Sequence, residues 1–248
     1  QWVDGLYTKS ITDEFIISSK DFSKSTKTAD TMMIPLGSGD FSGDGIPEFV
    51  YGMLYVDLKK GSFIKPIFLT ISPEKGLSLF KPIMDVVPYV SNPRDTVIAD
   101  FNGDGINDIF IADTGVDYDP FPGYQNSLIL SAPNGKFINA TSNLPQILDF
   151  THGATSGDID SDGDIDLFVS NGDLNPNCVP MYNFFFENVN GKFKEESTKF
   201  GLKDYGVGRG SAIFDLENDG DMDLVVVSQK PIREYGPPSI TRLYRNDI

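Results

Sequence analysis

Four short loops of this 248-residue chain carry acidic side chains at a spacing that suits a hard cation. Each loop reads Asp-x-x-x-Asp-Gly, then two residues and another acid, so that oxygen-bearing side chains occupy positions 1, 3, 5 and 9 and glycine occupies position 6. Calcium takes about six to eight oxygen ligands, and the chain must turn tightly to bring alternate residues to one point. The pattern therefore predicts a calcium site in each loop.

The predicted ligands are the side chains at positions 1, 3, 5 and 9 of each loop and the backbone carbonyl at position 7. They are Asp40, Ser42, Asp44, Ile46 and Glu48 in loop 1, Asp100, Asn102, Asp104, Ile106 and Asp108 in loop 2, Asp158, Asp160, Asp162, Asp164 and Asp166 in loop 3, and Asp215, Glu217, Asp219, Asp221 and Asp223 in loop 4. Because protein groups fill every main position and no histidine is among them, up to four structural Ca²⁺ ions are expected rather than a catalytic metal. An EF-hand is excluded, since position 12 carries Tyr51, Ile111, Val169 and Val226 where that loop needs a bidentate Glu.

The loops recur with a nearly constant period and are expected to differ in affinity. Their first aspartates are 60, 58 and 57 residues apart, which a chance acidic patch would not produce. Ser42 brings no charge to loop 1, and Glu217 is one methylene longer than the residues at the same position of loops 2 and 3. We therefore expect loops 2 and 3 to bind calcium more tightly than loops 1 and 4.

The segments that flank the loops predict strands. A short apolar run follows each loop, at Phe49–Tyr51, Ile109–Ile111, Leu167–Val169 and Leu224–Val227. Asn134-Gly135 and Asn190-Gly191 are typical hairpin turns, joining strands expected at Ser127–Ala132 and Asn183–Asn188 to further strands. With one strand before the loop, each period contains four antiparallel strands, the sequence form of a β-propeller blade. The predicted fold is therefore all-β, with residues 1–248 forming one propeller domain whose repeats start near residues 40, 100, 158 and 215.

These motifs also resemble a known repeat family. The stretches that begin at Gly157-Asp158 and Ala99-Asp100 resemble the FG-GAP or VCBS repeats of integrin α-subunit propellers and of many bacterial surface and secreted proteins. The resemblance implies a calcium ion between the first two strands of each blade. It also implies an extracellular, cell-surface or periplasmic location.

Closure of the ring stays open at this stage. The fourth repeat ends after its third strand, at Leu243–Asp247, and residues 1–11 resemble the missing turn and fourth strand. A four-bladed ring closed by the N-terminal segment fits this pattern. So does part of a larger propeller, or a half-ring completed by another chain.

Strand parity separates the loops into two rims. The calcium loops share one rim with the turns between third and fourth strands, whereas the longer loops lie on the other rim. Long ordered loops on a rigid scaffold often carry binding residues. The candidate ligand-binding residues are Tyr118, Phe121, Tyr124, Tyr205, Arg209 and Tyr235. The alternative is that these side chains only fill gaps between blades.

Composition narrows the functional class. The net charge of −16 disfavours nucleic acid and anionic lipid surfaces as partners. Cys178 is the only cysteine, so no intrachain disulfide forms, and no apolar run is long enough for membrane insertion. The predicted function is that of an extracellular calcium-binding module for carbohydrate or protein ligands, in adhesion or in assembly with other chains or copies of itself.

An enzyme is the alternative function. Some carbohydrate lyases and hydrolases also resemble calcium-bearing propellers. The only histidine, His152, is the candidate catalytic group for that function, beside Tyr205 and Arg209. No nucleophile-elbow motif is present, and Cys178 has no identifiable histidine partner, so we assign no catalytic residue.

Overall fold

The structure is a computed structural model that describes residues 31–55, 65–72, 76–80, 83, 87–118, 121–172, 182–203, 207–229 and 240–247. These residues form strands β1 to β15 and two short 3₁₀ turns, η1 (Pro133–Gly135) and η2 (Thr141–Asn143). The strands make four antiparallel sheets. Their bounds are β1 Thr31–Gly39, β2 Glu48–Tyr55, β3 Ile67–Ser72 and β4 Gly76–Phe80 in sheet 1; β5 Pro93–Ala99, β6 Asp108–Asp113, β7 Ser127–Ala132 and β8 Lys136–Asn139 in sheet 2; β9 Thr151–Gly157, β10 Asp166–Asn171, β11 Phe184–Val189 and β12 Lys192–Glu195 in sheet 3; and β13 Val207–Phe214, β14 Asp223–Gln229 and β15 Arg242–Tyr244 in sheet 4.

Each sheet is an up-and-down meander in which strands adjacent in sequence pair with each other. The hairpin turns of sheets 2 and 3 form where the Asn-Gly pairs predict them. Asn134 and Gly135 have φ values of 67° and 69°, and Asn190 and Gly191 have 51° and 76°. Two successive positive φ angles are what a tight turn between antiparallel strands requires, and Asn and Gly adopt them at low cost.

The core consists of three layers, one between each pair of successive sheets. In β6, Ile109 and Ile111 pack toward sheet 1, whereas Phe110 packs toward sheet 3. In β11, Phe184 and Phe186 pack toward sheet 2, whereas Phe185 packs toward sheet 4. Since side chains alternate between the two faces of a strand, an uninterrupted apolar run buries both faces at once. This explains why the central strands are continuous apolar runs and not alternating ones.

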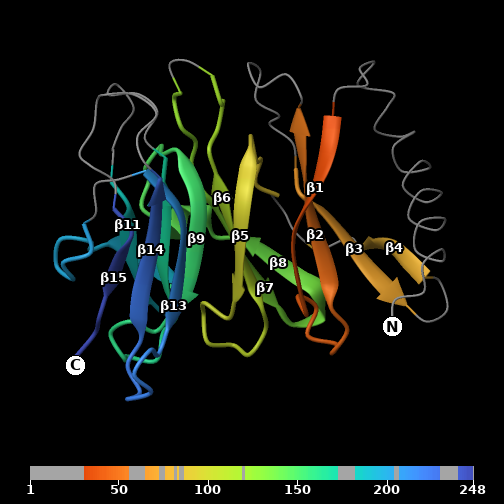
Figure 1. The fold of residues 1–248 in the computed structure, drawn as a ribbon. Helices are drawn as coiled ribbons and strands as arrows, with labels where there is room; N and C mark the ends of the chain where they lie inside the picture. Colours follow the sequence, from red (N-terminus) through yellow and green to blue (C-terminus); the bar gives the residue numbers. More distant parts are fainter. Residues whose placement is uncertain are drawn as a thin grey trace, which may run out of the picture.

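The four sheets follow one another in a row with their first strands side by side (Figure 1). Strand β1 contacts β5, β5 contacts β9, and β9 contacts β13. The approach is close at Gly157, where an added Cβ would lie 2.4 Å from Cγ2 of Ile213 in β13. Glycine therefore allows these first strands to adjoin at this point.

The all-β prediction is confirmed, since the described residues form four antiparallel sheets and almost no helix. Within that described part of the chain, the row of sheets does not close into a ring (Figure 1). Sheet 4 has three strands and ends at β15, as the sequence predicts. The segment 1–11, expected to supply the fourth strand, lies outside the described residues.

Candidate metal centres and the opposite rim

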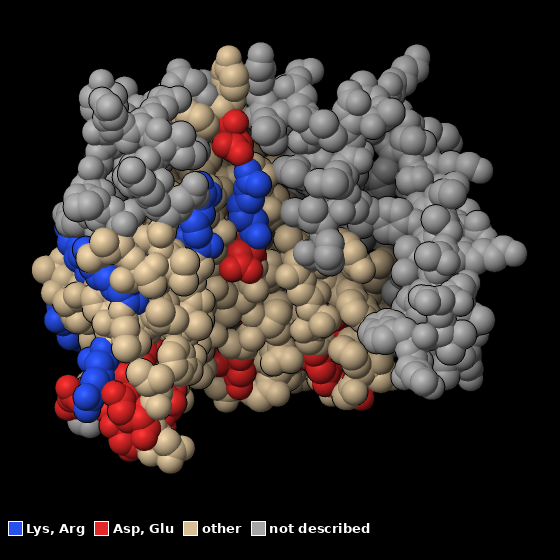
Figure 2. Space-filling view, viewed as in Figure 1, with Lys and Arg blue, Asp and Glu red and all other residues tan. Residues whose placement is uncertain are grey.

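All four acidic loops connect the first strand of a sheet to its second strand and lie along the same edge of the structure (Figure 1). Acidic side chains gather along this lower edge in the space-filling view (Figure 2). The loops share one backbone conformation, because the glycine at position 6 has a φ of 83°, 84°, 96° and 101° in loops 1 to 4. A side chain is disfavoured at such angles, which accounts for the glycine in every repeat.

The aspartate at position 1 folds each loop around its carboxylate. In loop 3, Oδ1 of Asp158 accepts a hydrogen bond from the backbone N–H of Asp162 at 3.1 Å, and Oδ2 accepts one from Gly163 at 3.0 Å. The equivalent pairs of bonds occur in loops 1, 2 and 4. Each loop is thus shaped by its own acidic side chain.

The acid at position 9 is buried and ties the loop to the sheet. Asp166 accepts hydrogen bonds from the backbone N–H groups of Ile159 at 3.0 Å and of Asn188 at 2.9 Å, and its side chain is fully buried. Asp108 and Asp223 make the equivalent pairs of bonds. Burial raises the pKa of Asp108 and of Asp166 to about 7, and the backbone hydrogen bonds oppose that shift. A cation beside these groups favours their charged form.

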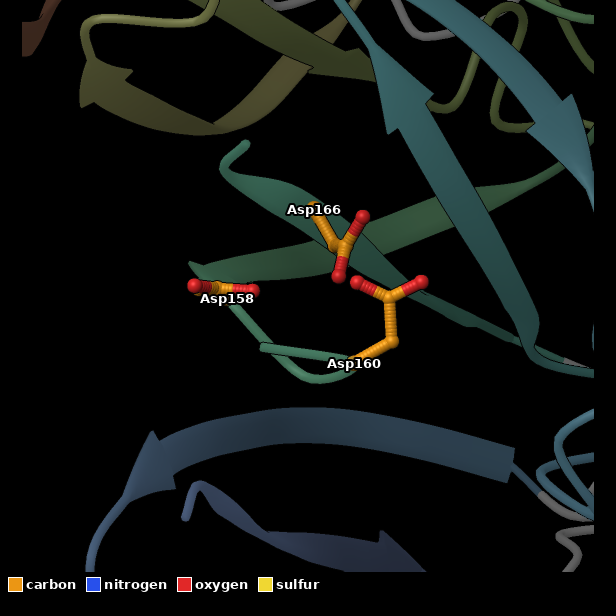
Figure 3. Close-up of side chains that lie close together, drawn as sticks. All are labelled: Asp158, Asp160 and Asp166. Carbon is orange, nitrogen blue, oxygen red and sulfur yellow. The ribbon is translucent and has the colours of Figure 1, made fainter. Parts of the chain in front are cut away.

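Loop 3 brings three carboxylates to one point. One oxygen each of Asp158, Asp160 and Asp166 lies within 4.8 Å of the other two. Figure 3 shows the carboxylates of Asp160 and Asp166 pointing toward each other, with Asp158 beside them. Burial and the neighbouring Asp162 raise the pKa of Asp160. Like charges this close repel each other, and a divalent cation among them removes the repulsion.

Loops 1 and 4 differ from this arrangement through their own side chains. In loop 1 the Ser42 hydroxyl lies 3.2 Å from Oε1 of Glu48, to which it donates a hydrogen bond. In loop 4 Oε1 of Glu217 forms an ion pair with Nε of Arg245 at 2.9 Å. The guanidinium thus holds the carboxylate that position 3 would offer to a metal.

The side chain of Asp164 in loop 3 makes a contact outside its loop. It accepts a hydrogen bond from the N–H of Asn190 in the β11–β12 turn at 2.8 Å.

These contacts give a first prediction about the loops. Asp162→Ala should lower the melting temperature in calcium more than Asp44→Ala, because loop 3 has three converging carboxylates and loop 1 has Ser42 in place of one of them. Calorimetry of the two variants with and without calcium measures the difference. A larger loss for Asp44→Ala would contradict the expected order of affinities.

The other predicted site residues lie on the opposite rim where they are described. Tyr118, Phe121 and Tyr124 belong to the loop after β6, and Arg209 belongs to β13. Tyr118 is 48% exposed, whereas Phe121 and Tyr124 are half-buried. Phe121 has a φ of 53°, which is a strained conformation for a bulky residue, and its ring packs edge-on against Phe150 at 5.6 Å. Tyr205 and Tyr235 lie outside the described residues.

The structure also places His152 beside Arg209 on this rim, near two residues that the sequence did not suggest, Arg94 and Asp117. Nη1 of Arg209 lies 3.1 Å from Nδ1 of His152, and Arg94 pairs with Asp117 at 2.5 Å between Nη2 and Oδ2. Burial and the nearby guanidiniums of Arg209 and Arg94 lower the pKa of His152 to about 4. His152 is therefore neutral at pH 7. Arg94 and Asp117 were missed because neither belongs to a recognisable motif.

The comparisons with known proteins agree with the repeat motif. Residues 100–169, which span loops 2 and 3, match the FG-GAP-like repeat family. The chain therefore contains an FG-GAP-like repeat, as its sequence motifs indicate. No curated protein matches the chain.

Among solved structures, the chain is similar to the V. cholerae biofilm matrix protein Bap1 in its crystal structure. The match has 14% sequence identity and a TM-score of 0.30, and it covers 80% of this chain. The chain spans about a third of the length of that protein, since 34% of it is covered. A likeness at this TM-score carries no argument about function. In the described part of the chain, no helix is long and apolar enough to cross a bilayer.

Proposed function

We propose that this chain is an extracellular, calcium-stabilised module of the β-propeller kind that binds a carbohydrate or protein ligand on the rim opposite its calcium loops. The observation that carries the proposal is the convergence of Asp158, Asp160 and Asp166 in a loop whose conformation recurs in all four repeats. The FG-GAP-like repeat at residues 100–169 supports it, because such repeats resemble those of extracellular propellers.

Two features of the sheets support the propeller geometry. The sheets pack face to face through apolar layers, and their first strands adjoin in chain order, as blades do around an axis. Among the described residues sheet 4 has no fourth strand, and beside β15 they leave a groove lined by apolar side chains that include Leu243, Met222 and Phe200. An apolar strand next to β15 would cover this groove and pair the open edge of the sheet. The proposed candidate is the segment 1–11.

Calcium is the proposed ion because the loops offer oxygen ligands only. Carboxylates, an amide and backbone carbonyls suit a hard cation with flexible geometry, whereas zinc and copper sites use imidazole or thiolate. The role is structural, since the buried acids at position 9 join the loops to the third strands of the sheets. Calcium bound there would hold the first, second and third strands of a sheet together.

Ligand binding is placed on the opposite rim because that rim carries longer loops and exposed aromatic groups. Tyr118 presents half of its surface to solvent, and its loop is braced by the packing of Phe121 on Phe150. Aromatic rings on a rigid support give a large contact area at a small cost in conformational entropy. This rim therefore suits recognition better than the calcium rim, whose side chains shape the loops.

A substitution on this rim tests the proposal. Tyr118→Ala should weaken binding to a ligand found by screening the full chain against glycans and extracellular proteins, by about tenfold or more for a residue at the centre of the interface. The calcium-dependent melting temperature should not change. Tyr235→Ala is the second variant, since Tyr235 belongs to the same predicted set.

The matched control is Phe214→Ala, which removes an exposed aromatic ring at the calcium-loop end of β13. It should leave binding unchanged. Equal weakening by Phe214→Ala and Tyr118→Ala would place the ligand elsewhere. Turnover of a polysaccharide that disappears in His152→Ala would instead establish the alternative function, a carbohydrate-active enzyme.

A further inference from the structure

Three successive sheets carry a β-bulge at the same place in the repeat. In β5, Pro93 and Asp95 pair with consecutive residues of β6, so Arg94 is the extra residue. In β9 the extra residue is His152, between Thr151 and Gly153. In β13 it is Arg209.

Each of these residues stands six positions before the first aspartate of its calcium loop. A bulge sets two residues against one and redirects a side chain, and bulges are frequent beside binding sites. In sheet 1 the bulge falls at Leu36, which is four positions before Asp40. The shared position is therefore a feature of sheets 2, 3 and 4.

The adjoining first strands bring the three bulged residues together. Nη1 of Arg209 lies 3.1 Å from Nδ1 and 3.3 Å from Nε2 of the His152 ring. Arg94 lies on β5, which contacts β9. Burial lowers the pKa of His152 and of Arg209, and the charge of Arg94 lowers both further. Figure 2 shows basic side chains near one another at the centre of the view, with acidic side chains above and below one of them.

The surrounding chain holds this cluster in place. The His152 ring lies against Gly172, where an added Cβ would come within 2.0 Å of Cε1, and it packs edge-on against Phe150 at 5.1 Å between ring centres. Asp95, the neighbour of Arg94, accepts the backbone N–H of Ala154 at 3.1 Å and so links β5 to β9. The bulged residues are thus set on packed strands and not on free loops, which gives a site with fixed geometry.

The composition of the cluster determines what it binds. The guanidinium of Arg209 lies 3.1 Å from the ring of His152, and an oxyanion beside it would form charge-assisted hydrogen bonds with it. Asp117 shows that a carboxylate fits here, since its Oδ2 lies 2.5 Å from Nη2 of Arg94. The chain as a whole carries −16 charges, so a densely charged polyanion is repelled, whereas a single acidic group on an otherwise neutral ligand is not.

We propose that Arg94, His152 and Arg209 form a binding site for one oxyanion group, a carboxylate or a sulfate, on an acidic saccharide unit. The inference rests on the proposed function, because it names the ligand class of the rim opposite the calcium loops. The sugar ring beside the acidic group faces the loop that carries Asp117 and the exposed Tyr118.

The single histidine of the chain provides a direct readout. The imidazole resonances of His152 are followed by NMR while the full chain, saturated with calcium, is titrated with three probes of equal size: a galactose trisaccharide in which one unit is galacturonic acid, a mono-sulfated galactose trisaccharide and the neutral galactose trisaccharide. The expected result is a saturable shift with one or both acidic probes and none with the neutral one. The two acidic probes distinguish a carboxylate site from a sulfate site.

Variants assign the effect to the cluster. Arg209→Gln and Arg94→Gln should each weaken binding of the acidic probe by about tenfold or more, the usual effect of losing a charge-assisted hydrogen bond. Arg209→Lys retains the charge and should bind with intermediate affinity, which separates loss of binding from loss of folding. Lys194→Gln, which removes an exposed cation from β12, is the matched control and should bind as the unmodified chain does.

Three results would overturn the inference. The first is the absence of any saturable shift of His152 with both acidic probes. The second is binding of the acidic probes that Arg94→Gln and Arg209→Gln leave unchanged. Binding of the neutral trisaccharide that Tyr118→Ala abolishes would also contradict the oxyanion site. The same result would support the proposed function of the rim. Failure of the oxyanion site can therefore be distinguished from failure of the proposed function.

Discussion

Asp166→Ala is expected to destabilise the protein by about 3 to 5 kcal/mol, as measured by denaturant unfolding in calcium. The carboxylate is fully buried and accepts two backbone N–H groups, from Ile159 before it and from Asn188 in the third strand. Removing it leaves both donors without an acceptor in the interior, and each such donor costs about 1 to 3 kcal/mol. A proposed calcium ligand is lost as well.

The control comes from the same loop. Asp162 is exposed and accepts one backbone N–H, from Asp164 at 2.9 Å. Asp162→Ala removes a proposed calcium ligand without leaving a buried donor, and we expect it to cost about half as much as Asp166→Ala or less. If the two variants lost equal stability, the position 9 acid would act only as a ligand and not as a link between loop and sheet.

Removal of calcium is the second change with a large expected effect. With a dissociation constant of about 0.1 mM, which is typical of extracellular modules, about 1 mM calcium stabilises the folded chain by roughly 1.4 kcal/mol per site. Loops 2 and 3 then contribute about 3 kcal/mol, and four sites of that affinity would approach about 6 kcal/mol. Since about 1 kcal/mol shifts the melting temperature of a chain this long by roughly 2 to 4 °C, chelation should lower it by about 10 °C.

Two controls make the chelation result specific. Magnesium at the same concentration should restore less stability than calcium, because it demands a smaller and more regular shell of ligands. The variant Asp160→Ala should show a smaller calcium response than the unmodified chain, since Asp160 belongs to the converging group of loop 3. An unchanged melting temperature after chelation would refute the calcium assignment.

The local elements follow from the sequence because each depends on residues close together in the chain. The apolar runs after the loops predict β6, β10 and β14, and the Asn-Gly pairs predict the turns at residues 134–135 and 190–191. Loop conformation is equally local, since the glycine at position 6 and the aspartate at position 1 determine it. In these segments the periodicity and the turn chemistry agree with the final structure.

The groups that sequence reasoning missed depend on contacts between distant residues. Arg245, which directly follows the third strand of sheet 4, forms an ion pair with Glu217, and no local pattern in the sequence indicates that pair. The bulges at Arg94, His152 and Arg209 arise from strand register, which the spacing of apolar residues does not resolve. Equivalent positions of the repeats carry the signal that could have found these residues, because each of the three stands six positions before the first aspartate of its loop.

Whether the row of sheets closes into a ring is the part of the fold that neither the repeats nor the described sheets determine. The repeats give the order and packing of the sheets, since successive sheets share apolar layers. Closure depends on what lies beside β15 and beside sheet 1. The sequence of residues 1–11 resembles a strand, but β15, its expected partner, lies at the other end of the chain.

Native mass spectrometry of the full chain across a calcium titration counts the ions that the chain binds. We expect saturable binding of two to four ions per chain, with the first two lost in the double variant Asp100→Ala, Asp158→Ala and retained in Asp40→Ala, Asp215→Ala. A chain that binds no calcium at millimolar concentration, or whose first two ions survive loss of Asp100 and Asp158, would contradict this expectation.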